Sequence, residues 1–593
     1  IIVTANGTET YIEDVGQAIT EIKLGTLETR QATSVADLLS NTPGVTVTRN
    51  GGIGQTTAVR IRGAEDSQTL VLIDGVRVND PSSPGGAFDF ANLLSGNISR
   101  IEVLRGPNSV PWGSQALGGV VNIITAPTPS DFGGNIRAEY GYKNSKQIVG
   151  QIGGTKGKVS ASLGGGVFDD DGISAYSGGT ERDGYRQYAA NGRVGVALSD
   201  TVSLDFRGYY ANSRTQYDGY QSSFPYAQID TAEFSKTQEL FGYAGLNART
   251  GNLKNRLSVT INDINRDYFD PAFGTTPSFI GRGRTERFEY QGDWEISDAA
   301  RAVFGVEHEN SRYADDFDRF STQVNSGYAQ LIVKPLENIT LTGGARVDDH
   351  KTYGSKATFS TNAAWRPFEG MKIRASFGQG FKAPTLFQLF SFLGNATLKP
   401  ETADSFDVGV EQSLLDGALK VGATYFHRDT NNQIDFADCY GSAAPRCITQ
   451  PDGYYDNIAR TRTKGIEAFI EMHPTDRLTT SLNYSLIDAK NRSTGAPLIR
   501  RPEHSVNGAI DWNARDWLKL GASVQLVSDS VDGFGGSIRL DGYTLISVRA
   551  AVPIGDKLEL YGRIENLLDA RYTVVSGYGT LGRNAHVGIR AKF

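Results

Sequence analysis

The feature that most constrains this chain is a two-residue alternation of apolar and polar side chains that runs from about residue 134 to Phe593. In residues 338–348, small or apolar side chains occupy every second position, and polar side chains fill the positions between them. Residues 558–565 and 586–593 repeat the pattern. The alternation predicts β-strands whose two faces meet different surroundings. Strands that place one face on lipid and the other on a hydrated lumen have this pattern.

Length separates a membrane barrel from a soluble β-sandwich, whose strands alternate in the same way. At 593 residues the chain exceeds one ordinary domain, and no domain break is visible within the alternating part. The 69 glycines, 26 tyrosines and 28 phenylalanines favour tight turns, strands and aromatic girdles. No apolar stretch approaches the roughly 20 residues of a membrane-spanning helix. The sequence therefore predicts a large antiparallel transmembrane β-barrel.

Composition and spacing argue against several other functions. A formal net charge of −7 leaves no basic footprint for nucleic acid. The six histidines are scattered, with no Ser-His-Asp spacing and no cluster of metal ligands, so we do not expect an enzyme. The chain begins at Ile1 without a signal peptide, which we interpret as a mature or trimmed form.

Turns of two lengths predict that the two ends of the barrel differ. Short turns such as 199–200 and 555–556 suit the periplasmic end. Longer polar stretches suit extracellular loops, and they are residues 168–187, 214–234, 266–284, 312–324, 348–356, 430–458 and 488–502.

Residues 6–128 predict a small mixed α/β domain that precedes the strands. A short helix is expected after Ser34, whose side chain suits an N-cap, and it should end before Pro43 and Gly44. The expected strands of this domain are residues 61–63, 70–73 and 101–104.

Three motifs in this domain, residues 72–76, 101–107 and 118–125, resemble in sequence and order the plug of the TonB-dependent outer-membrane receptors. The resemblance implies a monomeric barrel of about 22 strands, set in outer-membrane lipid, with the plug in its lumen. It implies energised import of a scarce nutrient, driven by TonB and its inner-membrane complex. The loops would be extracellular, and the plug and N-terminus would face the periplasm. The implied divisions are a TonB box (1–5), a plug (6–128) and a barrel (129–593).

The residues that resemble the TonB box are Ile1, Ile2, Val3, Thr4 and Ala5. An apolar, β-branched segment at a chain end can add as an edge strand to the sheet of a partner. Main-chain hydrogen bonds would then bear a pulling force. The family resemblance implies that ligand binding outside changes the exposure of this segment inside.

Arg62, Glu102 and Arg105 resemble a buried charged set that ties plug to barrel wall in this family, with ordinary surface charge as the alternative. Cys439 and Cys447 lie close together in a polar segment. In an oxidising compartment they would form a disulfide, and the alternative is two free thiols.

Further stretches of the sequence resemble one group within this family and thereby indicate a ligand. Residues 50–55, 79–88, 122–125, 217–218 and 498–501 resemble stretches of the vitamin B12 receptors, at similar spacing over nearly the whole chain. The implied ligand is cobalamin or a related corrinoid, which is flat, neutral and rich in amides and needs many polar contacts. The candidate ligand-binding residues are Asn50, Gln55, Thr56, Thr57, Ser82, Ser83, Phe88, Tyr226, Tyr268 and Arg500. The alternative is that these are only polar loop tips.

Vitamin B12 receptors bind calcium through acidic residues of two neighbouring extracellular loops. Calcium accepts roughly 6–8 oxygen ligands in a flexible geometry. The matching candidates here are Asp171, Glu181, Asp183 and Asp230. A solvated acidic face is the alternative, because one family carboxylate falls at or beside Gly172, next to Asp171, and another falls near Tyr243, where this chain has no carboxylate. Tyr268 stands where the family has an asparagine that contacts cobalamin.

Other functions are alternatives to cobalamin import. The same energised transport could serve a siderophore, another vitamin or a glycan. A surface docking protein for phage is a further alternative. A passive porin would have neither a plug nor an N-terminal box.

Overall fold

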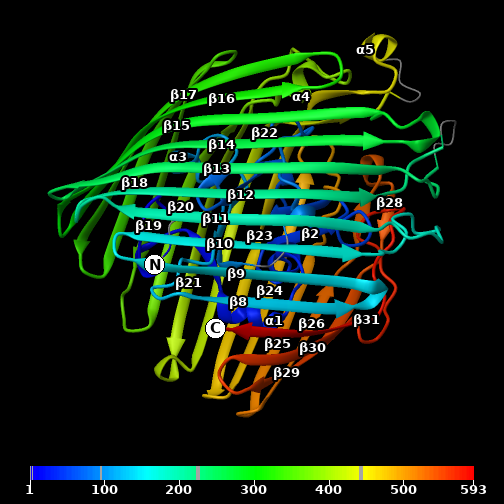
Figure 1. The fold of residues 1–593 in the computed structure, drawn as a ribbon. Helices are drawn as coiled ribbons and strands as arrows, with labels where there is room; N and C mark the ends of the chain where they lie inside the picture. Colours follow the sequence, from blue (N-terminus) through cyan, green and yellow to red (C-terminus); the bar gives the residue numbers. More distant parts are fainter. Residues whose placement is uncertain (1, 3, 94–96, 222–226, 440–444) are drawn as a thin grey trace.

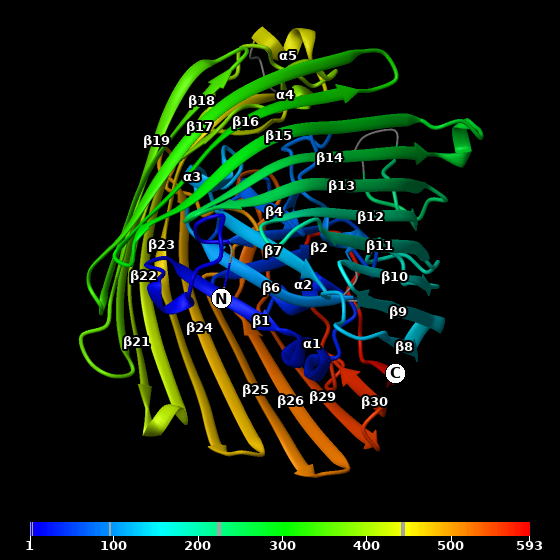
Figure 2. The ribbon, with the colours of Figure 1, turned by 60° about the vertical axis from the view of Figure 1, so that its left-hand side comes forward.

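The computed structural model describes the whole chain except residues 1, 3, 94–96, 222–226 and 440–444. A closed barrel of 22 antiparallel strands surrounds a small domain formed by the N-terminal residues (Figure 1). The predicted architecture, including the number of strands, is confirmed. Figure 2 shows the sheet of the small domain inside the barrel wall. We call this domain the plug.

The barrel strands follow one another along the chain. The first are β8 (Gly133–Gly141), β9 (Ser145–Lys156), β10 (Val159–Asp170), β11 (Tyr185–Ala197), β12 (Val202–Gln216), β13 (Phe234–Thr250), β14 (Leu253–Phe269), β15 (Phe279–Ser297), β16 (Ala300–Ala314), β17 (Arg319–Leu336) and β18 (Ile339–His350). The others are β19 (Gly354–Trp365), β20 (Met371–Lys382), β21 (Glu401–Leu414), β22 (Leu419–Ala437), β23 (Tyr454–Thr475), β24 (Leu478–Asn491), β25 (His504–Arg515), β26 (Leu518–Val527), β29 (Tyr543–Ile554), β30 (Leu558–Glu565) and β31 (Asn584–Lys592).

The barrel closes because β31 pairs with β8. Along each strand the side chains alternate between the outer surface and the lumen, as the period of two predicts. In β18, for example, Leu341 and Val347 are exposed on the outer surface, whereas Thr342 and Arg346 are buried against the plug side. The apolar face of the wall therefore points outward.

The two rims of the barrel carry connections of different length. All seven predicted loop stretches join strands at one rim, which we call the long-loop rim. The turns at 199–200 and 555–556 lie at the opposite, short-turn rim. The prediction missed residues 383–400, 528–542 and 566–583, which also join strands at the long-loop rim. These stretches are less uniformly polar, and the first two contain α4 (Leu386–Phe390) and the hairpin of β27 (Ser530–Asp532) and β28 (Ile538–Leu540).

The plug is a mixed α/β domain. Its main sheet has the order β1-β6-β7-β4-β5, in which only β4 and β7 run parallel. These strands are β1 (Ala18–Lys23), β4 (Thr69–Ile73), β5 (Val76–Arg77), β6 (Ile98–Arg105) and β7 (Gly119–Thr125). The remaining elements are α1 (Leu24–Arg30), α2 (Val35–Leu39), α3 (Ser109–Trp112) and the hairpin of β2 (Val45–Arg49) and β3 (Thr57–Ile61).

Local sequence explains where these elements begin and end. Ser34 caps α2, because its side chain accepts a hydrogen bond from the main-chain nitrogen of Asp37, which completes a capping box. The strands expected at 70–73 and 101–104 are present as β4 and β6. The strand expected at 61–63 stops at Ile61, because Arg62 and Gly63 have φ angles of 50° and 68°.

Two further features complete the fold. Cys439 and Cys447 form a disulfide at the long-loop rim, just before and within α5 (Pro445–Thr449). Among the residues that the structure describes, no helix is long and apolar enough to cross a membrane.

Candidate functional sites at the two ends of the plug

Three carboxylates gather in two neighbouring loops of the long-loop rim. Glu181 lies between β10 and β11, whereas Asp218 and Asp230 lie between β12 and β13. One carboxylate oxygen of each residue lies within 4.8 Å of the other two. Glu181 and Asp230 are exposed, and Asp218 is buried. We call this set the acidic cluster.

Main-chain donors hold the acidic cluster in place. Asp218 accepts hydrogen bonds from the nitrogens of Tyr176 (2.6 Å) and Thr231 (3.0 Å). A Cβ added at Gly179 would lie 1.9 Å from Oδ1 of Asp230. Only glycine therefore lets this loop approach the carboxylate so closely.

The charges of these groups are crowded. Burial, and then interaction with Asp218, raises the pKa of Glu181. Burial and the nearby Asp218 and Glu181 raise the pKa of Asp183 to about 7. The pKa of Asp218 is lowered in spite of its burial, because main-chain N–H groups donate to it. A divalent cation with oxygen ligands would relieve this repulsion, so the donor set fits calcium.

The structure brings together only part of the predicted metal set. Glu181 and Asp230 belong to the acidic cluster. Asp171 does not, because its carboxylate forms an ion pair with Arg182 at 3.0 Å. Asp218 belongs to the cluster although sequence reasoning did not choose it as a ligand. Residues 217–218 belong to a stretch that resembles the vitamin B12 receptors, but that resemblance did not mark Asp218 as a ligand, since the set forms only when the two loops meet.

The strand ends and loops that carry the acidic cluster contact the plug. The turn between β2 and β3, residues 50–56, faces the loops that carry the cluster, and we call it the apex turn. Nε2 of Gln55 donates to the main-chain oxygen of Gln216 at 2.5 Å. A Cβ at Gly54 would lie 2.1 Å from the ring of Tyr185 at the start of β11. A movement of either loop would therefore reach the apex turn.

Several predicted ligand contacts are structural in this conformation. Gln55, Thr57, Ser82, Ser83 and Phe88 are all buried. The hydroxyl of Ser82 donates to Asp80 at 2.7 Å, and the ring of Phe88 packs in the plug core. The hydroxyls of Thr57, Ser82 and Ser83 donate within the plug, whereas the amide of Gln55 donates to the wall. In this conformation these side chains serve the protein's own packing and hydrogen bonding.

The other predicted ligand contacts lie nearer the surface. Thr56 is exposed at the apex turn, and Asn50 is half-buried beside it. Tyr268 is half-buried near the end of β14, with its ring 6.3 Å from that of Tyr217. Tyr226 lies outside the described residues.

Three arginines toward the same end of the plug are paired with carboxylates. Arg500, predicted as a ligand contact, is one of them. The pairs are Arg266 with Asp80 at 2.7 Å, Arg500 with Asp532 at 2.8 Å and Arg501 with Glu65 at 2.6 Å. Their charges are therefore compensated within the protein.

At the opposite end of the plug, the N-terminal segment is buried. Ile2 and Ala5 are fully buried, and Ile2 exchanges two main-chain hydrogen bonds with Thr10, at 2.9 and 2.8 Å. Ile1 and Val3 lie outside the described residues. The described part of the predicted box is thus folded back against its own domain.

Three side chains hold the main chain of Thr4. Its nitrogen donates to Oε2 of Glu102 at 3.0 Å. Its oxygen accepts hydrogen bonds from Nε1 of Trp112 at 2.6 Å and from Nδ2 of Asn108 at 3.1 Å. We call these four residues the N-terminal latch. They occupy the main-chain groups that an edge strand would offer to a partner.

Ion pairs join the plug to the barrel wall. Of the three residues predicted to form them, Arg62 and Arg105 do so. Arg62 pairs with Glu467 of β23 at 2.8 Å and with Asp407 of β21 at 3.2 Å, and Arg105 pairs with Glu467 at 3.4 Å. Burial would lower the pKa of Arg62, but these two carboxylates raise it above its usual value. Glu102 does not take part in this set, because it belongs to the N-terminal latch.

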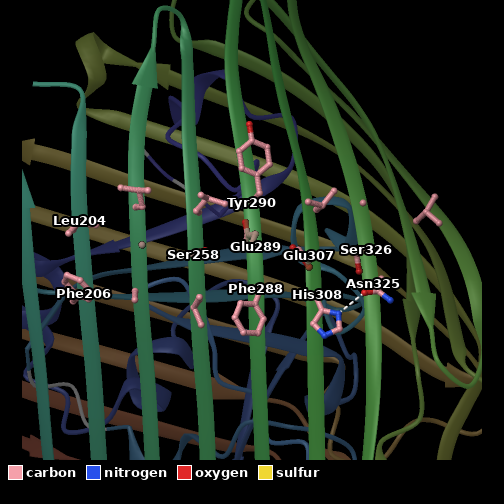
Figure 3. A pocket seen from close by; sticks show the side chains of 18 residues that line it. Leu204, Phe206, Ser258, Phe288, Glu289, Tyr290, Glu307, His308, Asn325 and Ser326 are labelled. Carbon is pink, nitrogen blue, oxygen red and sulfur yellow. Dashed lines mark hydrogen bonds between the residues drawn. The ribbon is translucent and has the colours of Figure 1, made fainter. Parts of the chain in front are cut away.

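A separate concavity of about 940 Å³ lies in the wall between β12 and β18 (Figure 3). Its exposed lining includes Phe206, Leu257 and Phe288 on the outward face of the strands. Nδ1 of His308 lies 2.8 Å from Oδ1 of Asn325 in the same lining. Because these side chains point away from the lumen, the concavity belongs to the outer surface of the barrel.

Comparison with known proteins agrees with this architecture. The family model described as TonB-dependent Receptor Plug Domain matches residues 12–120. The family model described as TonB dependent receptor-like, beta-barrel matches residues 128–567.

Solved structures with the same fold share little sequence with this chain. The siderophore receptor PirA from Acinetobacter baumannii has 18% identity and a TM-score of 0.83, and the match covers 100% of both chains. A ferric enterobactin receptor mutant from Pseudomonas aeruginosa has 20% identity and a TM-score of 0.81, covering 97% of this chain and 98% of that one. The ferripyoverdine receptor of Pseudomonas aeruginosa has 16% identity and a TM-score of 0.82, covering 100% and 88%. At such identities the likeness shows the fold alone.

Proposed function

The chain belongs to the TonB-dependent receptors of the bacterial outer membrane, and on that premise we propose that it imports cobalamin or a closely related corrinoid. TonB-dependent import of a ligand across this membrane is the function of the family. In the proposal, the long-loop rim faces the outside of the cell. The N-terminal latch then faces the periplasm, where TonB can reach it.

The acidic cluster is the observation that carries the proposed ligand. Glu181, Asp218 and Asp230 offer oxygen ligands from two neighbouring loops, which is the arrangement that the resemblance to vitamin B12 receptors implies. Calcium bound there would draw the two loops together and fix them over the apex turn. The cluster would thereby shape one wall of the ligand site.

The charge balance near the apex turn supports a neutral ligand. The guanidinium groups of Arg266, Arg500 and Arg501 are each bound to a carboxylate of the protein. An anionic ligand would have to compete with these internal pairs. A neutral, amide-rich corrinoid would instead use hydrogen bonds and aromatic surface, such as the exposed Thr56 and the ring of Tyr268.

A ferric siderophore is the second candidate. It is favoured by the solved structures, which are described as receptors for siderophores such as ferric enterobactin and ferripyoverdine. That argument rests on a shared fold at 16–20% identity, whereas the corrinoid argument rests on residues of this chain.

Transport connects the two ends of the plug. Ligand seated over the apex turn would move the loops that contact Gln55 and Gly54. The change would pass through the plug to the N-terminal latch and free Thr4 from Glu102. The released segment could then add as a strand to TonB, whose pull would loosen the plug.

The test is a titration of the purified receptor with cyanocobalamin, with calcium present and then chelated. We expect saturable binding that weakens on chelation. Asp218→Asn should weaken binding in calcium to the chelated level, because it removes the central carboxylate of the cluster. Asp171→Asn is the matched control, since Asp171 pairs with Arg182 outside the cluster, and it should bind like the wild type.

Three results separate the alternatives. Binding that is indifferent to chelation and to Asp218→Asn would keep the corrinoid and remove the calcium. Absence of cyanocobalamin binding would contradict the corrinoid proposal. Saturable binding of ferric enterobactin in place of cyanocobalamin would establish the siderophore candidate.

A further inference from the structure

We propose that a cavity between the plug and strands β26, β29 and β30 binds a small oxyanion such as phosphate, held between Arg30 and Arg549. The cavity has a volume of about 260 Å³ and is lined by both plug and wall residues. Pockets for drug-sized ligands have roughly 300–1,000 Å³, so this one suits a small solute rather than a corrinoid. The site is independent of the imported ligand.

The wall side of the cavity places two arginines face to face. Arg549 of β29 and Arg563 of β30 are directly opposite each other in the strand register. Like charges in such a cross-strand pair are destabilising. Arg563 is well compensated, since it pairs with Glu139 at 2.7 Å and with Glu565 at 2.8 Å. Arg549 has one carboxylate, Asp511.

The plug side adds a third guanidinium. Arg30, the last residue of α1, lines the same cavity. No ion pair of Arg30 occurs among the described residues, and its Nη1 is buried without a hydrogen-bond partner. Burial, and then the nearby charge of Arg549, lowers the pKa of Arg30, and the carboxylate of Asp511 offsets only part of this effect. Arg549 is itself only 8% exposed, and its Nε also has no partner.

Hydrogen bonds keep the two sides of the cavity close. Nε2 of Gln31 donates to the main-chain oxygen of Ala550 at 3.2 Å. Nη2 of Arg563 donates to the hydroxyl of Thr33 at 2.7 Å. The plug segment that carries Arg30 is thus fixed against the two strands that carry the wall arginines.

An oxyanion fits these surroundings better than water alone does. Asp511 acts on Arg30 without an ion pair between them, and Asp37 and Glu565 also line the cavity, but the buried Nη1 of Arg30 and Nε of Arg549 have no hydrogen-bond acceptor. An oxyanion would supply acceptors for both, because guanidinium groups bind such anions through paired hydrogen bonds. Bound there, it would bridge plug and wall. The contact between α1 and the barrel would then strengthen with the concentration of the anion.

The experiment uses the whole receptor, free of imported ligand, in two measurements. Phosphate binding is measured by calorimetry at constant ionic strength. Crystals soaked in selenate are examined for an anomalous peak between Arg30 and Arg549. We expect saturable phosphate binding and a selenate peak at this place.

Substitutions test whether Arg30 carries the site. Arg30→Gln should weaken phosphate binding about tenfold or more and remove the selenate peak, since a charge-assisted hydrogen bond is lost. Arg30→Lys keeps the charge without the planar fork and should bind at an intermediate strength. Lys23→Gln is the matched control, because it removes one positive charge from an exposed side chain at the other end of α1.

Two outcomes would overturn the proposal. One is the absence of both the selenate peak and saturable phosphate binding in the wild type. The other is equal weakening by Arg30→Gln and Lys23→Gln, which would indicate a general effect of net charge. If Arg30→Gln does not fold, phosphate binding by Arg30→Lys, which retains the charge, is compared with that of the wild type to test the role of Arg30.

Discussion

The main chain of one residue, Thr4, is held by Glu102, Asn108 and Trp112. Each of these hydrogen bonds uses an N–H or C=O group that β-addition to a partner would need. The bonds are few, and a typical one contributes only about 0.5–1.5 kcal/mol. A closed latch of this size can therefore open in response to a modest change in the plug.

The latch predicts how the N-terminal segment becomes accessible. Trp112→Phe removes one hydrogen bond to Thr4 and should speed thiol labelling of an Ile2→Cys reporter about threefold to tenfold. The reporter position is fully buried in the closed state. Tyr11→Cys is the control, because Tyr11 is 59% exposed and should label fast in both backgrounds. Equal labelling of the Ile2→Cys reporter with Trp112 and with Phe at that position would contradict the latch.

A half-buried carboxylate of the plug, Asp89, predicts a dependence on pH. Asp89 accepts hydrogen bonds from the nitrogens of Thr57 (2.8 Å) and Ala91 (3.0 Å), but burial raises its pKa above 3.8. Because the pKa of Asp89 is higher in the folded protein than in the unfolded protein, its contribution to stability is fully present below the unfolded-state pKa. The contribution is lost as pH rises through the folded-state pKa. Asp89→Asn keeps the acceptor oxygen and should make the plug more resistant to urea at pH 7 than the wild type is.

Asp37 serves as a control, because its pKa is shifted in the opposite direction to that of Asp89. Burial opposes its ionisation, but Arg49 and Ser34 lower its pKa below 3.8. The stabilising contribution of Asp37 is present above its unfolded-state pKa and is lost as pH falls through its folded-state pKa. Asp37→Asn should therefore weaken the plug at pH 7. Urea unfolding at pH 4 and pH 7 measures both variants, and a change of the same sign in both at pH 7 would contradict this account.

At the scale of elements, the plug is joined to the wall where β3 ends. The positive φ of Arg62 turns the chain out of the strand and directs its guanidinium to Glu467 and Asp407. Arg105, at the end of β6, reaches the same Glu467. One wall carboxylate thus fixes the ends of two plug strands.

This junction predicts a large effect of one wall substitution. Glu467→Gln leaves two buried guanidinium groups short of a partner and should cost about 3 kcal/mol of plug stability. Hydrogen exchange of β3 and β6 should rise in the variant. Glu471→Gln is the matched control, because Glu471 lies on the same strand but is exposed and pairs with His473. If the exchange of β3 and β6 were the same in both variants, the junction would not hold the plug.

The sequence predicted elements better than it predicted sites. Period-two alternation specifies strands wherever one face meets lipid and the other a polar lumen, and Ser34 marks the start of α2 by local hydrogen bonding. The loop at 383–400 was missed because it contains a helix and apolar side chains. The place of Asp218 in the acidic cluster and of Glu102 in the latch depends on partners distant in sequence, which no local pattern reveals.

In the whole molecule, the two candidate sites lie at opposite ends of one plug. The barrel loops that carry the acidic cluster contact the apex turn at the long-loop rim, and the N-terminal latch lies at the other end of the plug. The barrel holds the plug between them through buried ion pairs. Import requires that binding at one end changes the latch at the other while the barrel stays closed.

Uptake of radiolabelled cyanocobalamin by cells that produce this receptor tests whether the protein imports a corrinoid through TonB. Three cases are compared: the wild-type receptor in cells with TonB, the wild-type receptor in cells without TonB, and the Thr4→Pro receptor in cells with TonB. Proline has no main-chain N–H, so this variant can neither donate to Glu102 nor pair fully with a partner strand. We expect cyanocobalamin to bind at the cell surface in all three cases and to accumulate only in cells with the wild-type receptor and TonB. Equal accumulation in all three, or no binding in any, would contradict corrinoid import through TonB.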